Sequence, residues 1–163
     1  MTKLISLLTI ALALLSSATF AETLKVASWN IAWLGSHEYN QRKDTDYEKL
    51  ARYAKELDAD VIALQEVESE KWAKKVFGDE YDYFFTTKDW VQRVGVAVRK
   101  SSGYKANAIE YRELDQGLAR RGMDVTLTKD GKSVRLLAVH MKSGCFDKAL
   151  DQGSIANVPN TNE

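Results

Sequence analysis

The order of its apolar segments is the feature that most constrains how this chain can fold. Residues 24–33 begin with alternating apolar and polar side chains and end before a glycine, which is typical of a β-strand. Residues 46–57 carry apolar side chains at helical spacing, behind a capping-box pattern at residues 45–48. Residues 61–64 form a short continuous apolar run that predicts a strand covered on both faces. Strand, helix and strand in this order indicate the start of an α/β layer.

Shorter segments follow along the rest of the chain. A second helix is predicted at residues 69–77, and a hairpin turn at residues 129–132. Five more strands are predicted, at residues 81–86, 94–99, 104–111, 123–128 and 133–140. With 45% hydrophobic and 28% charged residues, the composition is that of one globular domain.

The two ends of the chain do not fit this domain. Residues 1–21 combine Lys3 with an apolar run and then small residues, the pattern of a secretory signal peptide, so we expect cleavage near Ala21 and a secreted or periplasmic protein. The apolar run is short for a bilayer span and no later segment is apolar enough, so we expect no stable membrane anchor. Residues 147–163 are polar, contain the only proline, and are interpreted as a tail. The predicted domain therefore covers residues 22–146.

Net charge does not select a substrate. The 23 basic and 23 acidic residues become 22 and 23 once Lys3 is removed with the signal peptide. A near-neutral chain argues against holding nucleic acid through bulk charge, so phosphate binding would need a local cluster. The cations that could form such a rim are Arg99, Lys100, Arg120, Arg121 and Lys142.

Three polar residues, Asn30, Glu66 and His140, stand at the ends of predicted strands, which meet at one rim of a layered α/β fold. Burial of an unpaired Glu66 carboxylate would cost several kcal/mol, roughly, so it needs a partner. A hard divalent cation is one such partner, with the Asn30 amide oxygen as a neutral co-ligand or a water-positioning group. Taken singly, Glu66 could instead emerge into solvent or pair with an arginine, and His140 could be a structural histidine. The pair Arg120 and Arg121 could clamp a phosphate or lie on a solvated face.

The combination of segments resembles a known family. Five segments occur in order: LKVASWNIAW at 24–33, DVIALQEV at 60–67, QRVGVAVRK at 92–100, RRGMDVTL at 120–127 and LLAVHMKSGCF at 136–146. Together they resemble the first half of the endonuclease/exonuclease/phosphatase superfamily, which includes pancreatic-type deoxyribonuclease, and five ordered matches are more specific than any one motif. The resemblance implies an α+β fold: a four-layer sandwich of two mixed β-sheets flanked by helices, of which only the first half is present.

The resemblance also implies roles for individual residues. Asn30 and Glu66 match the family residues that serve the metal, Mg²⁺ or Mn²⁺. His140 matches the histidine that lies against the scissile phosphate, and Gln92 stands where some nuclease members carry a glutamate that orients it. Phosphate binding is assigned to Arg121, which matches the family's phosphate-contacting arginine, and to Lys142 of the His-x-Lys-Ser-Gly segment.

The chain also departs from the family pattern. It contains neither the Gly-Asp-x-Asn segment nor the Ser-Asp-His segment that completes the family's site. Cys145 is the only cysteine, whereas secreted bacterial members often carry a partner for it; a buried thiol, a free thiol and an intermolecular link all stay open.

These departures lead us to expect a truncated, metal-dependent phosphodiester hydrolase, most similar to nucleases and of low activity alone. Its substrate would be nucleic acid or another phosphodiester, and its partner the missing C-terminal half. The alternative is a catalytically silent remnant or binding domain that keeps half of the fold.

Overall fold

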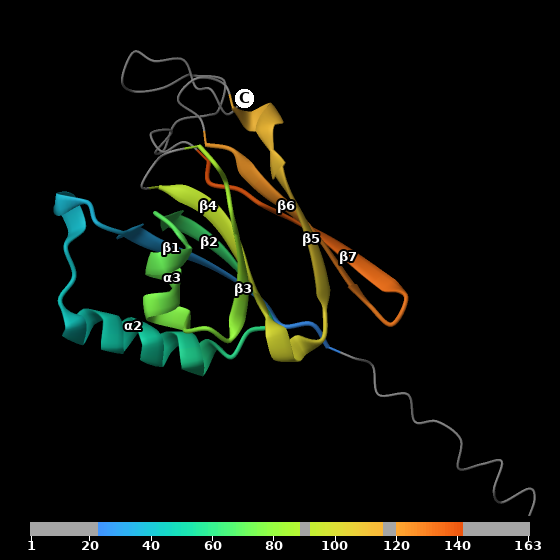
Figure 1. Cartoon of the computed structure of the whole chain (residues 1–163), viewed down its shortest axis with the longest axis horizontal. Coiled ribbons are helices and arrows are strands. Elements are labelled where there is room, and N and C mark those ends of the chain that lie inside the picture. The colour runs from blue at the N-terminus through green and yellow to red at the C-terminus, as the bar shows by residue number, and fades with distance from the viewer. Residues whose placement is uncertain (1–22, 89–91, 116–119, 142–163) are drawn as a thin grey trace, which may run out of the picture.

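The computed structural model describes residues 23–88, 92–115 and 120–141, which form two β-sheets and two α-helices (Figure 1). In chain order the elements are β1 (Val26–Leu34), the 3-10 helix η1 (Glu38–Asn40), α2 (Asp44–Leu57), β2 (Val61–Val67), α3 (Glu70–Phe77), β3 (Tyr81–Phe85), β4 (Arg93–Arg99), η2 (Lys100–Ser102), β5 (Lys105–Tyr111), η3 (Arg112–Leu114), β6 (Gly122–Lys129) and β7 (Lys132–Ala138). None of the described helices is both long and apolar enough to cross a membrane.

The two sheets lie face to face, and α2 and α3 cover the outer side of the first (Figure 1). The first sheet has the order β1-β2-β4-β3, with β1 parallel to β2 and the other neighbours antiparallel. The second sheet, β5-β6-β7, is antiparallel throughout. One apolar core fills the space under the helices and includes Ile62, Leu64 and Phe77. The other lies between the sheets and includes Val96 and Val125.

The alternation of side chains along β2 breaks at its end. Ile62 and Leu64 face the core under the helices, and by strict alternation residue 66 would follow them. A bulge directly after Gln65 instead gives that core position to Val67, which is completely buried. Glu66 is the extra residue of the bulge, and its backbone takes a left-handed conformation with φ +59°. The bulge therefore keeps a carboxylate out of the apolar core and leaves it at the rim of the sheet.

β1 carries a larger irregularity directly opposite. Asn30 pairs with Gln65 and Leu34 pairs with Val67, so residues 31–33 face a single residue of β2. Ala32 and Trp33 are left-handed, with φ +46° and +62°. Both strands thus bend at the same level, and this bend positions the candidate site.

In the part of the chain that the structure describes, the sandwich is open along one side. β1 and β7 are the last strands of their sheets, and the gap between them is a hollow of about 360 Å³ lined by apolar side chains that include Val61, Leu136 and Ala138. Val26, at the edge of this hollow, is 48% exposed. Exposed apolar side chains beside two free strand edges indicate a surface that another chain segment can cover.

The expected α+β sandwich is confirmed, and every predicted helix and strand is present within a few residues of its expected limits. Within the described residues the second sheet is antiparallel. One detail was wrong: α2 begins at Asp44 with Lys43 as its N-cap residue, where the Asp46 carboxylate accepts the Lys43 backbone N–H at 3.0 Å. The three short 3-10 helices were not predicted. The expected signal peptide, the tail and Cys145 lie outside the described residues.

Candidate active site

The bulged ends of β1 and β2 bring Asn30 and Glu66 together. Asn30 Nδ2 donates a hydrogen bond to Glu66 Oε1 at 3.1 Å. The other end of the same carboxamide, Oδ1, accepts the backbone N–H of Ala32 at 2.9 Å. Asn30 is therefore held from both sides, by the neighbouring strand end and by its own bulge.

His140, which follows the end of β7, joins this pair from the second sheet. Its Nε2 atom lies 3.4 Å from Glu66 Oε1, and both side chains are mostly buried, with exposed fractions of 16% and 14%. Burial lowers the pKa of His140 below its usual value, as does the positive charge of Arg120, while the Glu66 carboxylate acts in the opposite direction. A lowered pKa keeps the imidazole neutral at pH 7, so one of its nitrogens can accept a proton. Its Nδ1 atom is buried and has no hydrogen-bond partner among the described residues.

Arg120 supplies the positive charge of the site. It lies just before β6 and is half-buried, and burial lowers its pKa while the charge of Glu66 raises it. One terminal nitrogen of its guanidinium donates to Gln92 Oε1, whereas Nε is buried with no partner among the described residues. The Arg120 guanidinium thus brings a positive charge toward the Glu66 carboxylate.

Gln92, at the start of β4, belongs to the same rim. It is buried, and its carboxamide oxygen accepts the hydrogen bond from Arg120. The contact places Gln92 against the arginine and not on His140 Nδ1. Its predicted role in orienting His140 stays a prediction.

Arg121 is directed to a different set of partners. Its Nε atom donates to Asp115 at 2.7 Å, and one terminal nitrogen donates to Glu110 at 3.2 Å and to the Thr87 hydroxyl at 3.3 Å. Two carboxylates therefore already neutralise this guanidinium. The structure brings Arg120, and not Arg121, to Glu66 and His140, while the predicted role of Arg121 in phosphate binding stays untested.

The proposed basic rim does not assemble as a whole. Because β4 runs antiparallel to β2, Arg99 and Lys100 emerge at the opposite end of the first sheet from Glu66. This part of the expectation was wrong, because the sequence does not reveal the direction of β4. Lys142, the other predicted phosphate-binding residue, lies outside the described residues.

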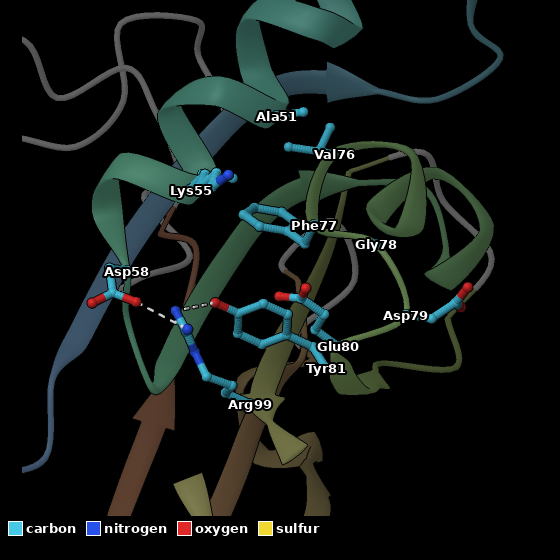
Figure 2. Close-up of a pocket in the computed structure, with 11 residues that line it drawn as sticks. Ala51, Lys55, Asp58, Val76, Phe77, Gly78, Asp79, Glu80, Tyr81 and Arg99 are labelled. Atoms are coloured by element: carbon cyan, nitrogen blue, oxygen red, sulfur yellow. Dashed lines mark hydrogen bonds and ion pairs between the residues drawn. The ribbon is translucent and has the colours of Figure 1, made fainter. Parts of the chain in front are cut away.

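Arg99 lines a second hollow of about 500 Å³ at that opposite end (Figure 2). Its guanidinium pairs with Asp58 at 2.9 Å and donates to the Tyr81 hydroxyl and to the Ala59 carbonyl oxygen, each at 3.0 Å. These contacts fasten the turn between α2 and β2 to β4, so they account for Arg99 structurally.

The donor set around Glu66 fits a divalent cation that the substrate helps to hold. One carboxylate and one neutral imidazole converge there, with the Asn30 carboxamide beside the carboxylate. The described part of the chain contains no cluster of three or more His, Cys, Asp or Glu residues that could form a closed metal cage. Mg²⁺ is commonly held by one or two carboxylates together with water and substrate phosphate, so a single carboxylate is compatible with such a site.

Sequence reasoning named Arg120 only together with Arg121, without a choice between them, and it missed Arg42, which the structure also places at this site. Arg120 and Arg121 both precede β6, which begins at Gly122, so the alternation of side chains along the strand does not show which of them faces the sheet interface. Arg42 lies in a loop with no periodic pattern, and its three backbone contacts with the end of β1 depend on tertiary structure alone.

The described residues share the fold of part of several solved TDP2 structures. A crystal structure of D. rerio TDP2 humanized by 14 mutations matches with a TM-score of 0.59 and 21% identity, over 74% of this chain and 48% of that chain. Truncated Caenorhabditis elegans TDP2 matches with a TM-score of 0.58 and 22% identity, over 74% and 47%. D. rerio TDP2 complexed with single strand DNA product matches with a TM-score of 0.57 and 21% identity, over 76% and 48%.

An endonuclease/exonuclease/phosphatase family protein from Leptotrichia buccalis C-1013-b also matches, with a TM-score of 0.47 and 17% identity, over 77% of this chain and 56% of that chain. The chain thus spans about half the length of the TDP2 structures quoted above. No protein-family model and no curated protein matches it.

Proposed function

We propose that this chain is an exported, metal-dependent phosphodiester hydrolase of the nuclease type. The observation that carries the proposal is the meeting of Asn30, Glu66 and His140 at the strand ends, at 3.1 Å and 3.4 Å from one Glu66 oxygen. Asn30 and Glu66 come from two strands of the first sheet, and His140 follows the last strand of the second. Apolar residues would pack these strand ends better, so packing alone does not account for three polar side chains here. The signal-peptide pattern of residues 1–21 supports export.

Each side chain has a role that its chemistry supports. Glu66 and the Asn30 amide oxygen would hold Mg²⁺ or Mn²⁺, which when bound supplies charge stabilisation for a phosphodiester under attack. Asn30 Oδ1 has two lone pairs and gives only one to the Ala32 N–H, so it retains an acceptor. Neutral His140 can accept a proton or a hydrogen bond at the reacting phosphate, and Arg120 can donate to its oxygens.

The substrate we propose is nucleic acid, with other phosphodiesters as the broader class. One TDP2 structure of the same fold holds a single strand DNA product, which supports this choice by analogy of fold. The near-neutral charge of the chain favours recognition through the local site over tight binding along a long duplex.

Metal titration tests the centre of this proposal. We expect Mn²⁺ or Mg²⁺ to bind the chain in calorimetry, and Glu66→Gln to abolish that binding because it removes the only carboxylate of the set. Glu48→Gln, on the exposed face of α2, is the matched control for the charge change and should bind as the parent chain does. Unchanged affinity in Glu66→Gln would remove this residue from the metal site.

The two neighbouring arginines provide a second test. Arg120→Gln should weaken binding of a non-hydrolysable phosphodiester about ten- to a hundred-fold, as expected for the loss of a charged hydrogen bond to phosphate. Arg121→Gln should leave that affinity nearly unchanged and lower stability instead, because Arg121 neutralises Asp115 and Glu110. The opposite pattern would return the phosphate role to Arg121.

A catalytically silent binding domain is the second candidate, and one observation favours it. The carboxylate that reaches His140 is that of Glu66, the proposed metal ligand, and the described residues show no second carboxylate that could support His140 as a general base. Metal binding without measurable hydrolysis of a chromogenic diester would select this candidate. Hydrolysis that depends on both metal and His140 would exclude it.

A further inference from the structure

The left-handed bend of β1 is the least expected feature of the candidate site. Ala32 and Trp33 both have positive φ, a conformation that side chains with a β-carbon disfavour. Two such residues in succession persist only where the surrounding structure fixes them. The bend must therefore be held by specific contacts.

Arg42 provides those contacts. It lies in the loop before α2, half-buried, and one terminal nitrogen donates to the Ile31 carbonyl at 2.6 Å and to the Ala32 carbonyl at 2.8 Å. The other terminal nitrogen donates to the Trp33 carbonyl at 3.2 Å. Asn40 adds a hydrogen bond from its side-chain amide to the Ala32 carbonyl. One guanidinium thus binds three successive carbonyl groups of the bend.

The same bend orients the Asn30 carboxamide. The Ala32 N–H donates to Asn30 Oδ1 at 2.9 Å, and this bond requires the backbone of Ala32 to keep its direction. With Oδ1 fixed in this way, Nδ2 points to Glu66. A change of backbone direction at Ala32 would therefore release the amide oxygen and turn the whole carboxamide away from its place beside the carboxylate.

We propose that Arg42 is a positioning residue that fixes the bend of β1 and thereby the Asn30 amide beside Glu66. A planar guanidinium can serve three carbonyl groups at once, whereas a lysine ammonium on a flexible stem cannot hold the same set rigidly. The effect on the bend stands by itself, while the consequence for a metal rests on the proposed function.

The first readout uses the chain without metal. In Arg42→Gln, exchange of the Ala32 backbone amide with solvent, followed by NMR, should be at least about tenfold faster than in the parent chain, because its bond to Asn30 opens. Arg52→Gln is the matched control: Arg52 lies on the exposed face of α2 beside Tyr53, and its removal should leave Ala32 unaffected. Equal exchange at Ala32 in both variants would overturn the proposal.

The second readout is Mn²⁺ affinity measured by calorimetry. Arg42→Gln and Arg42→Lys should each weaken binding about ten- to a hundred-fold, the range found when outer groups that orient a metal ligand are removed. Adding Ala32→Gly to Arg42→Gln should recover about fivefold or more, because glycine adopts positive φ without steric cost. Loss of affinity that Ala32→Gly does not restore would indicate a role through charge or general stability, and would refute the positioning role.

The outcomes separate the two proposals. If the parent chain binds no Mn²⁺, the proposed function fails, but amide exchange at Ala32 still decides the role of Arg42. If Arg42→Gln does not fold, Asn40→Ala removes only the second donor to the Ala32 carbonyl and should show smaller changes in the same directions. Parent-like exchange and affinity in Asn40→Ala together with Arg42→Lys would then overturn the positioning role.

Discussion

Replacing Glu66 should reveal the backbone strain that the candidate site stores. Glu66 has φ +59° at the bulge of β2, and alanine at this position would carry the same β-carbon and the same strain. Glycine would carry none. We therefore predict that Glu66→Gly is more stable than Glu66→Ala, although glycine in a strand is normally the less stable of the two.

The magnitude follows from two opposing terms. Relief of the left-handed conformation favours glycine by about 1–2 kcal/mol. The greater freedom of glycine in the unfolded chain disfavours it by about 0.4–1 kcal/mol. The net preference for glycine over alanine should be about 0.5–1 kcal/mol, or a rise in Tm of about 2–5 °C for a domain of this size. Both variants lose the contacts of the carboxylate with Asn30 and His140, so this loss cancels in the comparison.

Urea unfolding of the two variants in metal-free buffer measures the difference directly, because bound metal would otherwise add its own stabilisation. Ser28 provides the matched control. It is an exposed residue of β1 without positive φ, and both substitutions remove its contact with Gln65. There the order should invert, with Ser28→Gly less stable than Ser28→Ala by about 0.5–1 kcal/mol.

The decisive result is a change of sign in the stability difference between the glycine and alanine variants, with glycine more stable at position 66 and alanine more stable at position 28. Alanine more stable than glycine at both positions would show that Glu66 is not held in a left-handed conformation in solution. The bulge would then not be the device that separates the carboxylate from the core, and the placement of Asn30 and His140 around Glu66 would need another explanation.

Three further predictions concern activity, the open side and acid. On the proposed function, the chain alone should hydrolyse a chromogenic phosphodiester only slowly, because its sequence has neither the Gly-Asp-x-Asn nor the Ser-Asp-His segment and the members of a catalytic set act non-additively; an ordinary enzymatic rate that disappears in His140→Ala would contradict this. The hollow between β1 and β7 should bind a hydrophobic dye, and Val26→Ser should weaken that signal, whereas a monomer with no dye signal would show that the chain covers the hollow itself. Stability to urea should fall as the pH drops below about 4.5. Hydrogen-bonded ion pairs lower the pKa of Asp58, Asp115 and Asp124, and hydrogen bonds from Thr87 and Arg121 lower the pKa of Glu110 against the effect of burial. These carboxylates therefore bind protons less readily in the folded chain than in the unfolded chain, and acid favours unfolding. An unchanged stability at pH 3.5 would show that these contacts do not persist in solution.

Most of the fold could be predicted because its signals are local. The alternation of β1, the helical spacing of α2 and the continuous apolar run of β2 each follow from which side chains must be buried. The order of motifs then gave the family fold, and the matches to TDP2 agree with it. The direction of β4 could not be predicted from these signals, because an apolar strand has the same pattern in either direction. Arg99 was therefore expected at the Glu66 end of the first sheet, whereas it lies at the opposite end.

The candidate site could be predicted only in part, because its geometry depends on departures from local rules. Asn30, Glu66 and His140 were identified from their positions at strand ends, where polar residues interrupt apolar runs. The bulge at Glu66, the bend at Ala32 and the choice between Arg120 and Arg121 are decided by tertiary contacts that leave no periodic trace in the sequence.

The positions of the left-handed residues connect these departures to function. Five non-glycine residues with positive φ occur in the described part of the chain. Asp58 ends α2 and Asp130 lies in the β6–β7 hairpin turn, where such a conformation closes a helix or a turn. Ala32, Trp33 and Glu66 end no helix and close no hairpin, yet all three lie where the Asn30 amide meets the Glu66 carboxylate.

Glycine would adopt these conformations at lower steric cost, but it would also leave the bend free to change direction. Residues with a β-carbon, fixed by Arg42 on β1 and by the burial of Val67 on β2, leave the strand ends few alternative conformations. The metal ligand pair that we propose needs that restriction, because an amide and a carboxylate displaced by about an ångström lose the geometry that a small cation requires. The strain is therefore best understood as the cost of keeping Asn30 and Glu66 in place before any ligand arrives.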